Sequence, residues 1–163
     1  MKADAVRQML GLADRTRVID LFDSLARGDI AAAFAEFRAQ YDVGADPVVV
    51  LSDLAEFVNF VTRVKFVPGT ADNVAFGETE RVRGRGFAAK LSTRVLSRMW
   101  QMLLKALEEV AAAPNAMMAA EMAIIRLTHV ADLPDPEALI RRVQAGQAAG
   151  ELSRPAMQAQ RAP

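Results

Sequence analysis

Apolar residues in this chain recur three and four positions apart, and glycine or proline interrupts the pattern at most of the points where it stops. Residues at these intervals share one face of an α-helix, whereas a strand buried on one side alternates apolar and polar residues. Val18, Leu21, Phe22 and Leu25 form one such set. The sequence therefore predicts an all-α fold, a single bundle of about six to seven helices.

Capping residues predict where the helices begin and end. Asp, Ser and Asn accept hydrogen bonds from the first free backbone N–H groups, and glycine adopts the left-handed conformation that commonly ends a helix. The first predicted helix carries Val6, Met9 and Leu10 on one face and is too short to be stable alone. Caps at Asp14, Asp29, Asp46, Ser92, Asn115 and Asp135 begin six of the predicted helices. The predicted helices are residues 3–10, which end before Gly11, then Asp14 to Gly28, Asp29 to Gly44, residues 47–66, Ser92 to Ala113, Asn115 to Val130, and a short helix after Asp135.

Two segments lack the helical pattern. Over residues 68–86 the apolar residues give way to Pro, Gly, Thr, Asp, Asn and Arg, which predicts a long irregular loop. After Gly146 the chain has almost no bulky apolar residues. We therefore expect a helical domain over residues 1–146 and a disordered linker rich in Ala, Gln and Pro over residues 147–163.

The predicted helix over residues 92–113 is unusually apolar. At about 100° per residue its polar side chains fall within an arc of about 120°, and apolar side chains cover the rest, whereas an ordinary surface helix has an apolar stripe of about 100°. The helix is therefore either central in its bundle or presents an apolar face to a partner, and the two interpretations are compatible. In the next helix we interpret Met117, Met118 and Met122 as core side chains, with an adaptable docking surface as the alternative.

Charge is balanced over the whole chain but not along it. The 20 Lys and Arg residues equal the 20 Asp and Glu residues, so no net field draws the chain to DNA or to an anionic membrane. Residues 68–107 nevertheless hold seven basic and three acidic side chains. There, Arg81, Arg83 and Arg85 form a candidate basic contact loop, and the segment 81–98 supports an alternative function as a nucleic-acid-binding helical module. A contact to an acidic protein and a plain solvated loop are the other interpretations.

Residues that carry catalysis or bind metals are scarce. The chain has no cysteine and a single histidine, His129, which excludes thiol nucleophiles, Cys-zinc sites and histidine metal pairs. A phosphate-binding loop, an H-E-x-x-H motif and a nucleophile elbow are all absent from the sequence. We therefore expect no enzyme activity, no catalytic residue, no metal and no cofactor. The charged N-terminus and the lack of a long apolar stretch predict a cytoplasmic protein without a membrane partner.

The order of several short motifs is informative. The N-terminal half holds Val6-Arg7-Gln8-Met9-Leu10-Gly11-Leu12-Ala13-Asp14, then Val18, Asp20-Leu21, Leu25, Gly28-Asp29, Gly44-Ala45-Asp46-Pro47 and Leu51. The C-terminal half holds Trp100-Gln101, Leu103-Leu104, Ala120-Glu121-Met122-Ala123, Ile125-Arg126-Leu127 and Leu133-Pro134. Together these motifs resemble the bacterial DNA polymerase III gamma/tau subunits over about residues 4–143, in the domain that follows the ATPase module of that family.

The resemblance implies a role in assembly. In that family this domain is a helical collar through which gamma/tau copies associate with each other and with the delta and delta-prime subunits of the clamp loader, which loads the sliding clamp during DNA replication. The resemblance implies that the apolar surface of helix 92–113 is partly a subunit interface, with Met99, Trp100, Leu103 and Leu107 as its residues. ATP, magnesium and zinc would belong to the family's N-terminal ATPase module, which this chain lacks. The chain thus resembles a piece of a longer subunit.

Overall fold

The computed structural model describes residues 15–130 and 140–147, and within these ranges the chain forms helices and turns but no strand. The all-α prediction is confirmed. The chain divides into two compact units, Met1–Asp132 and Leu133–Pro163, and the described part of the second unit is a helix at residues 140–147. The first unit contains a helix at residues 15–26, α2 (Ile30–Asp42), α3 (Pro47–Phe66), the 3-10 helix η1 (Pro68–Asp72), α4 (Glu78–Lys90), α5 (Thr93–Ala112) and α6 (Ala116–Val130).

Side-chain caps at four helix starts confirm the predicted boundaries. In each case a side-chain oxygen accepts a hydrogen bond from a backbone N–H of the first turn, at 2.9 to 3.2 Å. Gly28 and Gly44 follow two of the predicted helices and have positive φ angles of 71° and 99°, which a residue with a side chain adopts only with strain. The predicted helix over residues 3–10 and the cap at Asp135 lie outside the described residues. The four capping residues are Asp29 for α2, Asp46 for α3, Ser92 for α5 and Asn115 for α6.

The prediction of an irregular loop over residues 68–86 is wrong for most of this stretch, which forms η1 and most of α4. The helical pattern was weak here because Phe87 is the one bulky apolar side chain of α4 that is buried. Gly84 takes a buried position where a helix would normally place an apolar side chain. A Cβ atom at Gly84 would lie 2.6 Å from Cε1 of Phe60 on α3. The α4 backbone therefore packs directly against an aromatic ring.

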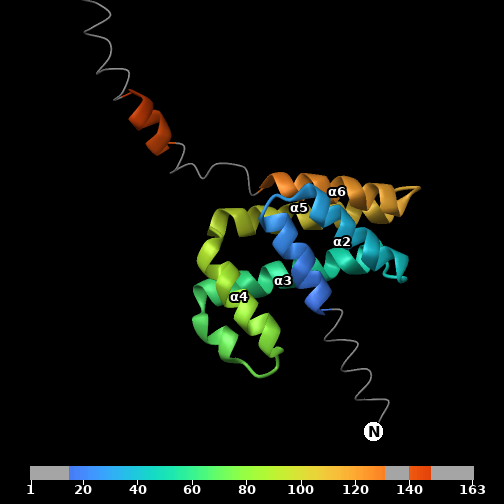
Figure 1. Cartoon of the computed structure of the whole chain (residues 1–163), viewed down its shortest axis with the longest axis horizontal. Coiled ribbons are helices and arrows are strands. Elements are labelled where there is room, and N and C mark those ends of the chain that lie inside the picture. Colours follow the sequence, from blue (N-terminus) through green and yellow to red (C-terminus); the bar gives the residue numbers. More distant parts are fainter. Residues whose placement is uncertain (1–14, 131–139, 148–163) are drawn as a thin grey trace, which may run out of the picture. The chain divides into compact units, whose positions relative to one another are not determined.

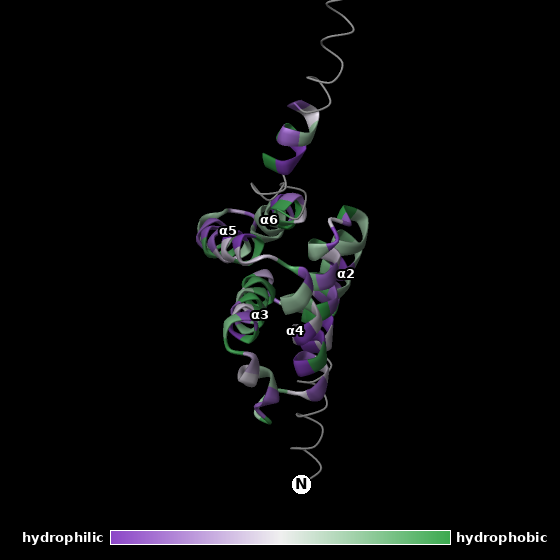
Figure 2. Cartoon of the chain, turned by 90° about the vertical axis from the view of Figure 1, so that its left-hand side faces the viewer, coloured by the Kyte–Doolittle hydropathy of each residue, from purple (hydrophilic) through white to green (hydrophobic). Residues whose placement is uncertain are grey.

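The central helix of the bundle is α3. Ten of its 20 residues are buried, more than in any other described helix, and it packs against α4, α5 and α6. Phe57 on α3 makes edge-to-face contacts with Phe22 and Phe87, with ring centroids 4.9 and 5.9 Å apart. Figure 1 shows α5 and α6 running side by side, and Figure 2 shows the same pair next to α3 in the turned view. The core thus joins residues from the whole of the described first unit.

Candidate subunit-contact surfaces

Next to its buried side, α5 exposes two large apolar side chains that lie one helical turn apart. Trp100 is 37% exposed and Leu104 is 44% exposed. Residues four positions apart are neighbours on a helix surface, so these two side chains form one apolar area, which we call the α5 patch. Burying apolar area of this kind against a partner is favourable by roughly 25 cal/mol per Å². Covering the α5 patch with another protein would therefore stabilise the complex.

The structure separates the four residues that the resemblance implied for a subunit interface. Met99 and Leu103 lie in the core of this chain and are 1% and 0% exposed. Leu107 is partly buried against the core, and Trp100 is exposed. A partner can reach Trp100 and the outer part of Leu107, but not the other two side chains. Leu104 is not among the four predicted residues, although its spacing of four from Trp100 places both on the same part of the helix surface.

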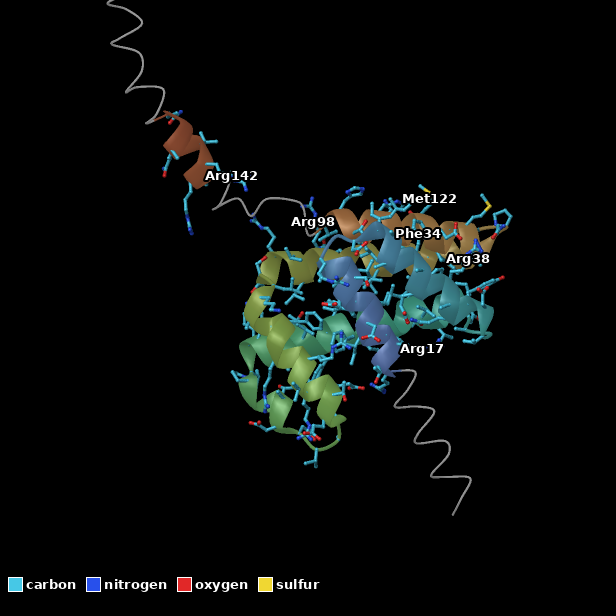
Figure 3. All side chains as sticks on the ribbon, in the orientation of Figure 1. Arg17, Phe34, Arg38, Arg98, Met122 and Arg142 are labelled. Carbon is cyan, nitrogen blue, oxygen red and sulfur yellow. The ribbon has the colours of Figure 1, made fainter. Side chains whose placement is uncertain are left out.

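A second apolar area lies where α2 packs against α6, and we call it the methionine surface. Its centre is Met118 and Met122, which are 63% and 50% exposed, so the interpretation of these two as core side chains is wrong. Met117, the third methionine of that interpretation, is partly buried against the core. Figure 3 shows Met122 on α6 and Phe34 and Arg38 on α2, the two helices that pack here. Arg38 Nη2 lies 3.7 Å from Glu121 Oε1 across the boundary between these helices. Flexible, polarisable methionine side chains suit a surface that adapts to a partner.

The three arginines predicted to form a basic contact loop lie on the helix α4 instead. Arg83 Nη1 donates a hydrogen bond to Asp20 Oδ1 at 2.6 Å, and Arg85 pairs with Asp72 on η1. Arg81 is partly buried. Two of the three guanidinium groups are therefore paired with carboxylates of this same chain. A phosphate backbone would have to displace those carboxylates, so the arrangement does not favour nucleic-acid binding.

A groove with a volume of about 380 Å³ lies against helix 15–26 and α3. Ile19, Phe57 and Phe60 contribute apolar walls, and Trp100 of α5 also lines it. At another part of its lining, Arg15 Nη1 lies 3.1 Å from Oε1 of the buried Glu80. Sequence reasoning missed this groove because its walls come from segments far apart in the chain. None of these residues has a distinctive local motif.

The described residues offer little for metal or acid–base chemistry. Within them, no group of three or more His, Cys, Asp and Glu side chains could hold a metal ion. His129, at the end of α6, is exposed. In the described part of the chain, no helix is both long enough and apolar enough to cross a membrane. The features that call for a functional explanation are therefore the exposed apolar surfaces and the groove.

Comparison with known proteins gives these surfaces a family context. The sequence profile of the family described as DNA polymerase III subunits gamma and tau domain III matches residues 1–143. Proteins named DNA polymerase III subunit gamma/tau, from Mycobacterium bovis and Mycobacterium tuberculosis, are each 28% identical to the chain over 153 residues. The alignment covers 93% of this chain but 26% of each relative, so the chain spans about a quarter of their length. The chain belongs to the family of domain III of the DNA polymerase III gamma and tau subunits.

Proposed function

We propose that this domain is an oligomerisation and subunit-assembly module of the DNA polymerase III clamp loader. It binds other gamma/tau copies and the delta and delta-prime subunits, and so supports loading of the sliding clamp during DNA replication in the cytoplasm. Membership of the gamma and tau family supports a place in this complex. The observation that carries the proposal is the α5 patch, because Trp100 and Leu104 are exposed beside the side of α5 that is fixed in the core.

The α5 patch has the composition and the rigidity expected of an interface anchor. Tryptophan is enriched among the residues that dominate binding energy at protein interfaces. Five buried residues hold α5 in place, so the helix loses little conformational entropy when the patch is covered. These five residues are Leu96, Met99, Leu103, Ala106 and Val110.

Two separate surfaces suit assembly into a ring. A ring built from head-to-tail contacts requires each subunit to meet its two neighbours through two different surfaces. The α5 patch and the methionine surface belong to different helices and have different apolar side chains. We propose that each faces a different neighbour in the clamp loader.

The proposed mechanism is positional. The domain would hold the ATPase modules of complete subunits in a fixed arrangement, so that each module meets the neighbour that completes its active site. We assign ATP hydrolysis, with its ATP, magnesium and zinc, to those modules. We propose no catalytic site and no cofactor in the domain described here.

Sedimentation velocity over a concentration series tests the proposal, with the chain alone and then mixed with the delta or delta-prime subunit. The double variant Trp100→Ala/Leu104→Ala should weaken association at least about tenfold, because truncating an interface hot spot costs about 2 kcal/mol or more. The matched control is Val49→Ala/Val82→Ala, which removes two exposed apolar side chains on α3 and α4. This control should associate like the unmodified chain.

Three other outcomes would contradict the proposal. A chain that stays monomeric and binds neither subunit has no assembly function as a separate domain. Equal association of the double variant and its control would place the interface elsewhere. If replacing Arg81, Arg83 and Arg85 abolished a salt-dependent DNA affinity while association stayed unchanged, the nucleic-acid-binding alternative would be favoured.

A further inference from the structure

We propose that α5 binds a protein partner whose contact surface is acidic as well as apolar. A row of unpaired basic side chains, Arg94, Arg98 and Lys105, runs beside the α5 patch, and we call it the basic stripe. This inference rests on the proposed assembly function and specifies the chemistry of the partner that covers the α5 patch. Acidic side chains of that partner would lie on the basic stripe, and its apolar side chains on Trp100 and Leu104.

The basic stripe is narrow and faces solvent. At about 100° per residue, its three side chains fall within an arc of about 40°. All three are exposed. The centre of the stripe lies about 140° around the helix from the centre of the buried side of α5. The stripe extends about 16 Å along the helix axis, since each residue adds about 1.5 Å. Three positive charges are therefore presented together on the outer side of α5.

The basic stripe has no carboxylate partner in the part of the chain that the structure describes. None of the six ion pairs between described residues involves Arg94, Arg98 or Lys105. Arg94 and Arg98 are also four positions apart, a spacing at which like charges on a helix repel each other. An acidic partner would relieve this repulsion without displacing an existing ion pair. The arginines that already have a carboxylate partner are Arg15, Arg27, Arg38, Arg83, Arg85 and Arg126.

The basic stripe and the α5 patch are close enough for one partner to contact both. Leu104 lies about 100° around the helix from the centre of the stripe, which is roughly 10 Å along the surface of a helix about 11 Å in diameter. In the axial direction, Trp100 and Leu104 both lie between Arg98 and Lys105. A partner helix about 10–12 Å wide spans this distance. Protein interfaces commonly combine an apolar centre with a polar rim, as this surface does.

The other side chains on this side of α5 are compatible with an acidic partner. Ser97 and Gln101 lie between the stripe and the patch and are neutral. Glu108 lies on the same arc, but near the C-terminal end of the helix. Glu109 is paired with Arg126 of α6, so that pair adds no net charge. Three basic side chains and the single unpaired Glu108 leave a net charge of +2 on this surface.

A protein suits this surface better than a nucleic acid does. The whole chain has zero net charge, so no long-range field concentrates a polyanion near α5. The affinity of a protein for nucleic acid grows with the number of phosphates that it neutralises, and three cations neutralise few. Trp100 and Leu104 add exposed apolar area, which a protein surface can bury. The combination of apolar and positive side chains therefore indicates an acidic protein surface.

Stopped-flow fluorescence of the full chain with two synthetic peptides tests the chemistry of the partner. Trp100 is the sole tryptophan and reports binding at the α5 patch. Both peptides are amphipathic helices with leucine along one face and no tryptophan. One carries glutamate along its flanks and the other carries lysine. The acidic peptide should change the Trp100 emission and associate at least about tenfold faster than the basic peptide at low salt, because favourable charge raises association rates by about 10- to 1,000-fold. Added salt should reduce this difference.

Charge substitutions in the basic stripe provide the matched comparison. Arg94→Gln/Arg98→Gln/Lys105→Gln should slow association of the acidic peptide at least about tenfold at low salt. The charge-reversed variant Arg94→Glu/Arg98→Glu/Lys105→Glu should prefer the basic peptide. This reversal would not follow from a general loss of structure, which would weaken the binding of both peptides.

The control variant removes the same number of positive charges outside α5. Arg27→Gln/Arg38→Gln/Arg85→Gln replaces three exposed arginines and should bind the acidic peptide like the unmodified chain. The control and the glutamine variant of the stripe have the same net charge. Any difference between them therefore arises from the position of the charges.

Contrary results are distinct from a failure of the proposed function. Equal association rates of the two peptides, or equal slowing by the stripe variant and its control, would overturn the inference. Binding of a single-stranded oligonucleotide through the stripe, without binding of the acidic peptide, would assign the stripe to nucleic acid instead. A chain that prefers the acidic peptide but neither self-associates nor binds the delta or delta-prime subunit would contradict the assembly function and retain the assigned chemistry. A chain that assembles but shows no peptide preference would contradict this inference alone.

Discussion

Replacing Gly84 with alanine should destabilise the domain, although alanine is the better helix former. Gly84 lies inside α4, and a Cβ atom there would lie 2.6 Å from Cε1 and 3.2 Å from Cδ1 of Phe60. The ring of Phe60 is buried and packs against Phe57 and Phe76, with centroid distances of 6.1 and 4.5 Å. The ring therefore cannot move away without disturbing its neighbours.

The magnitude follows from two opposing effects. Alanine is favoured over glycine in a helix interior by about 1 kcal/mol. Forcing an extra methyl group into a packed core costs about 1–3 kcal/mol. Gly84→Ala should therefore lower the free energy of unfolding by up to about 2 kcal/mol. Gly86→Ala lies two residues further along the same helix, where a Cβ atom meets nothing within 4 Å, so it should raise the free energy of unfolding by up to about 1 kcal/mol.

Urea and thermal denaturation, followed by far-ultraviolet circular dichroism, measure both variants beside the unmodified chain. The helix-propensity gain is common to the two variants, so their difference of about 1–3 kcal/mol isolates the contact with Phe60. Their melting temperatures should be separated by at least about 3 °C. Equal stabilisation by Gly84→Ala and Gly86→Ala would refute the close approach of α4 to α3.

Three further predictions concern a cap, an ion pair and the two sides of α5. Asp29→Ala should lower the free energy of unfolding by about 1 kcal/mol in urea denaturation, because it removes the cap of α2, and an unchanged midpoint would contradict the cap. A double-mutant cycle on Arg83 and Asp20 should give a coupling of about 0.2–1 kcal/mol that shrinks as salt is added, whereas zero coupling at low salt would show that the pair adds no stability. Leu103→Ala should lower the free energy of unfolding by about 2–5 kcal/mol in urea denaturation, because Leu103 is buried, whereas Leu104→Ala should lower it by under about 1 kcal/mol. Equal losses in the two variants would contradict the orientation of α5.

Most of the helices were predictable because their signals are local. A capping side chain accepts a hydrogen bond from an N–H only two or three residues away, and the apolar face of a helix repeats within a few turns. Both signals can therefore be recognised in a short stretch of sequence. The helix α4 lacked such a signal. Its buried positions include Glu80 and Gly84, whose burial depends on Arg15 and on Phe60 in other helices. Contacts between residues this far apart cannot be read from the pattern of a single segment.

The contact surfaces were predictable only in part, for the same reason. The sequence identified α5 as too apolar for an ordinary surface helix, and the structure confirms that it has both buried and exposed apolar side chains. The exposure of Met118 and Met122 was not predictable, because methionine is equally suited to a core and to a surface. Arg83 and Asp20 are 63 positions apart, so no local sequence pattern indicates that they pair.

The angular positions on α5 explain why Trp100 and Leu104 are accessible while Met99 and Leu103 are not. At about 100° per residue, the five buried residues of α5 fall on one side, and Trp100 and Leu104 lie about 80° and about 120° from its centre. Neither angle allows full burial against α3 or α6. An apolar arc of about two thirds of the circumference is wider than the intramolecular core covers, so the margin of the arc stays exposed. One helix therefore stabilises the domain with its inner side and, at the margin of its apolar arc, carries the exposed side chains that we propose for assembly.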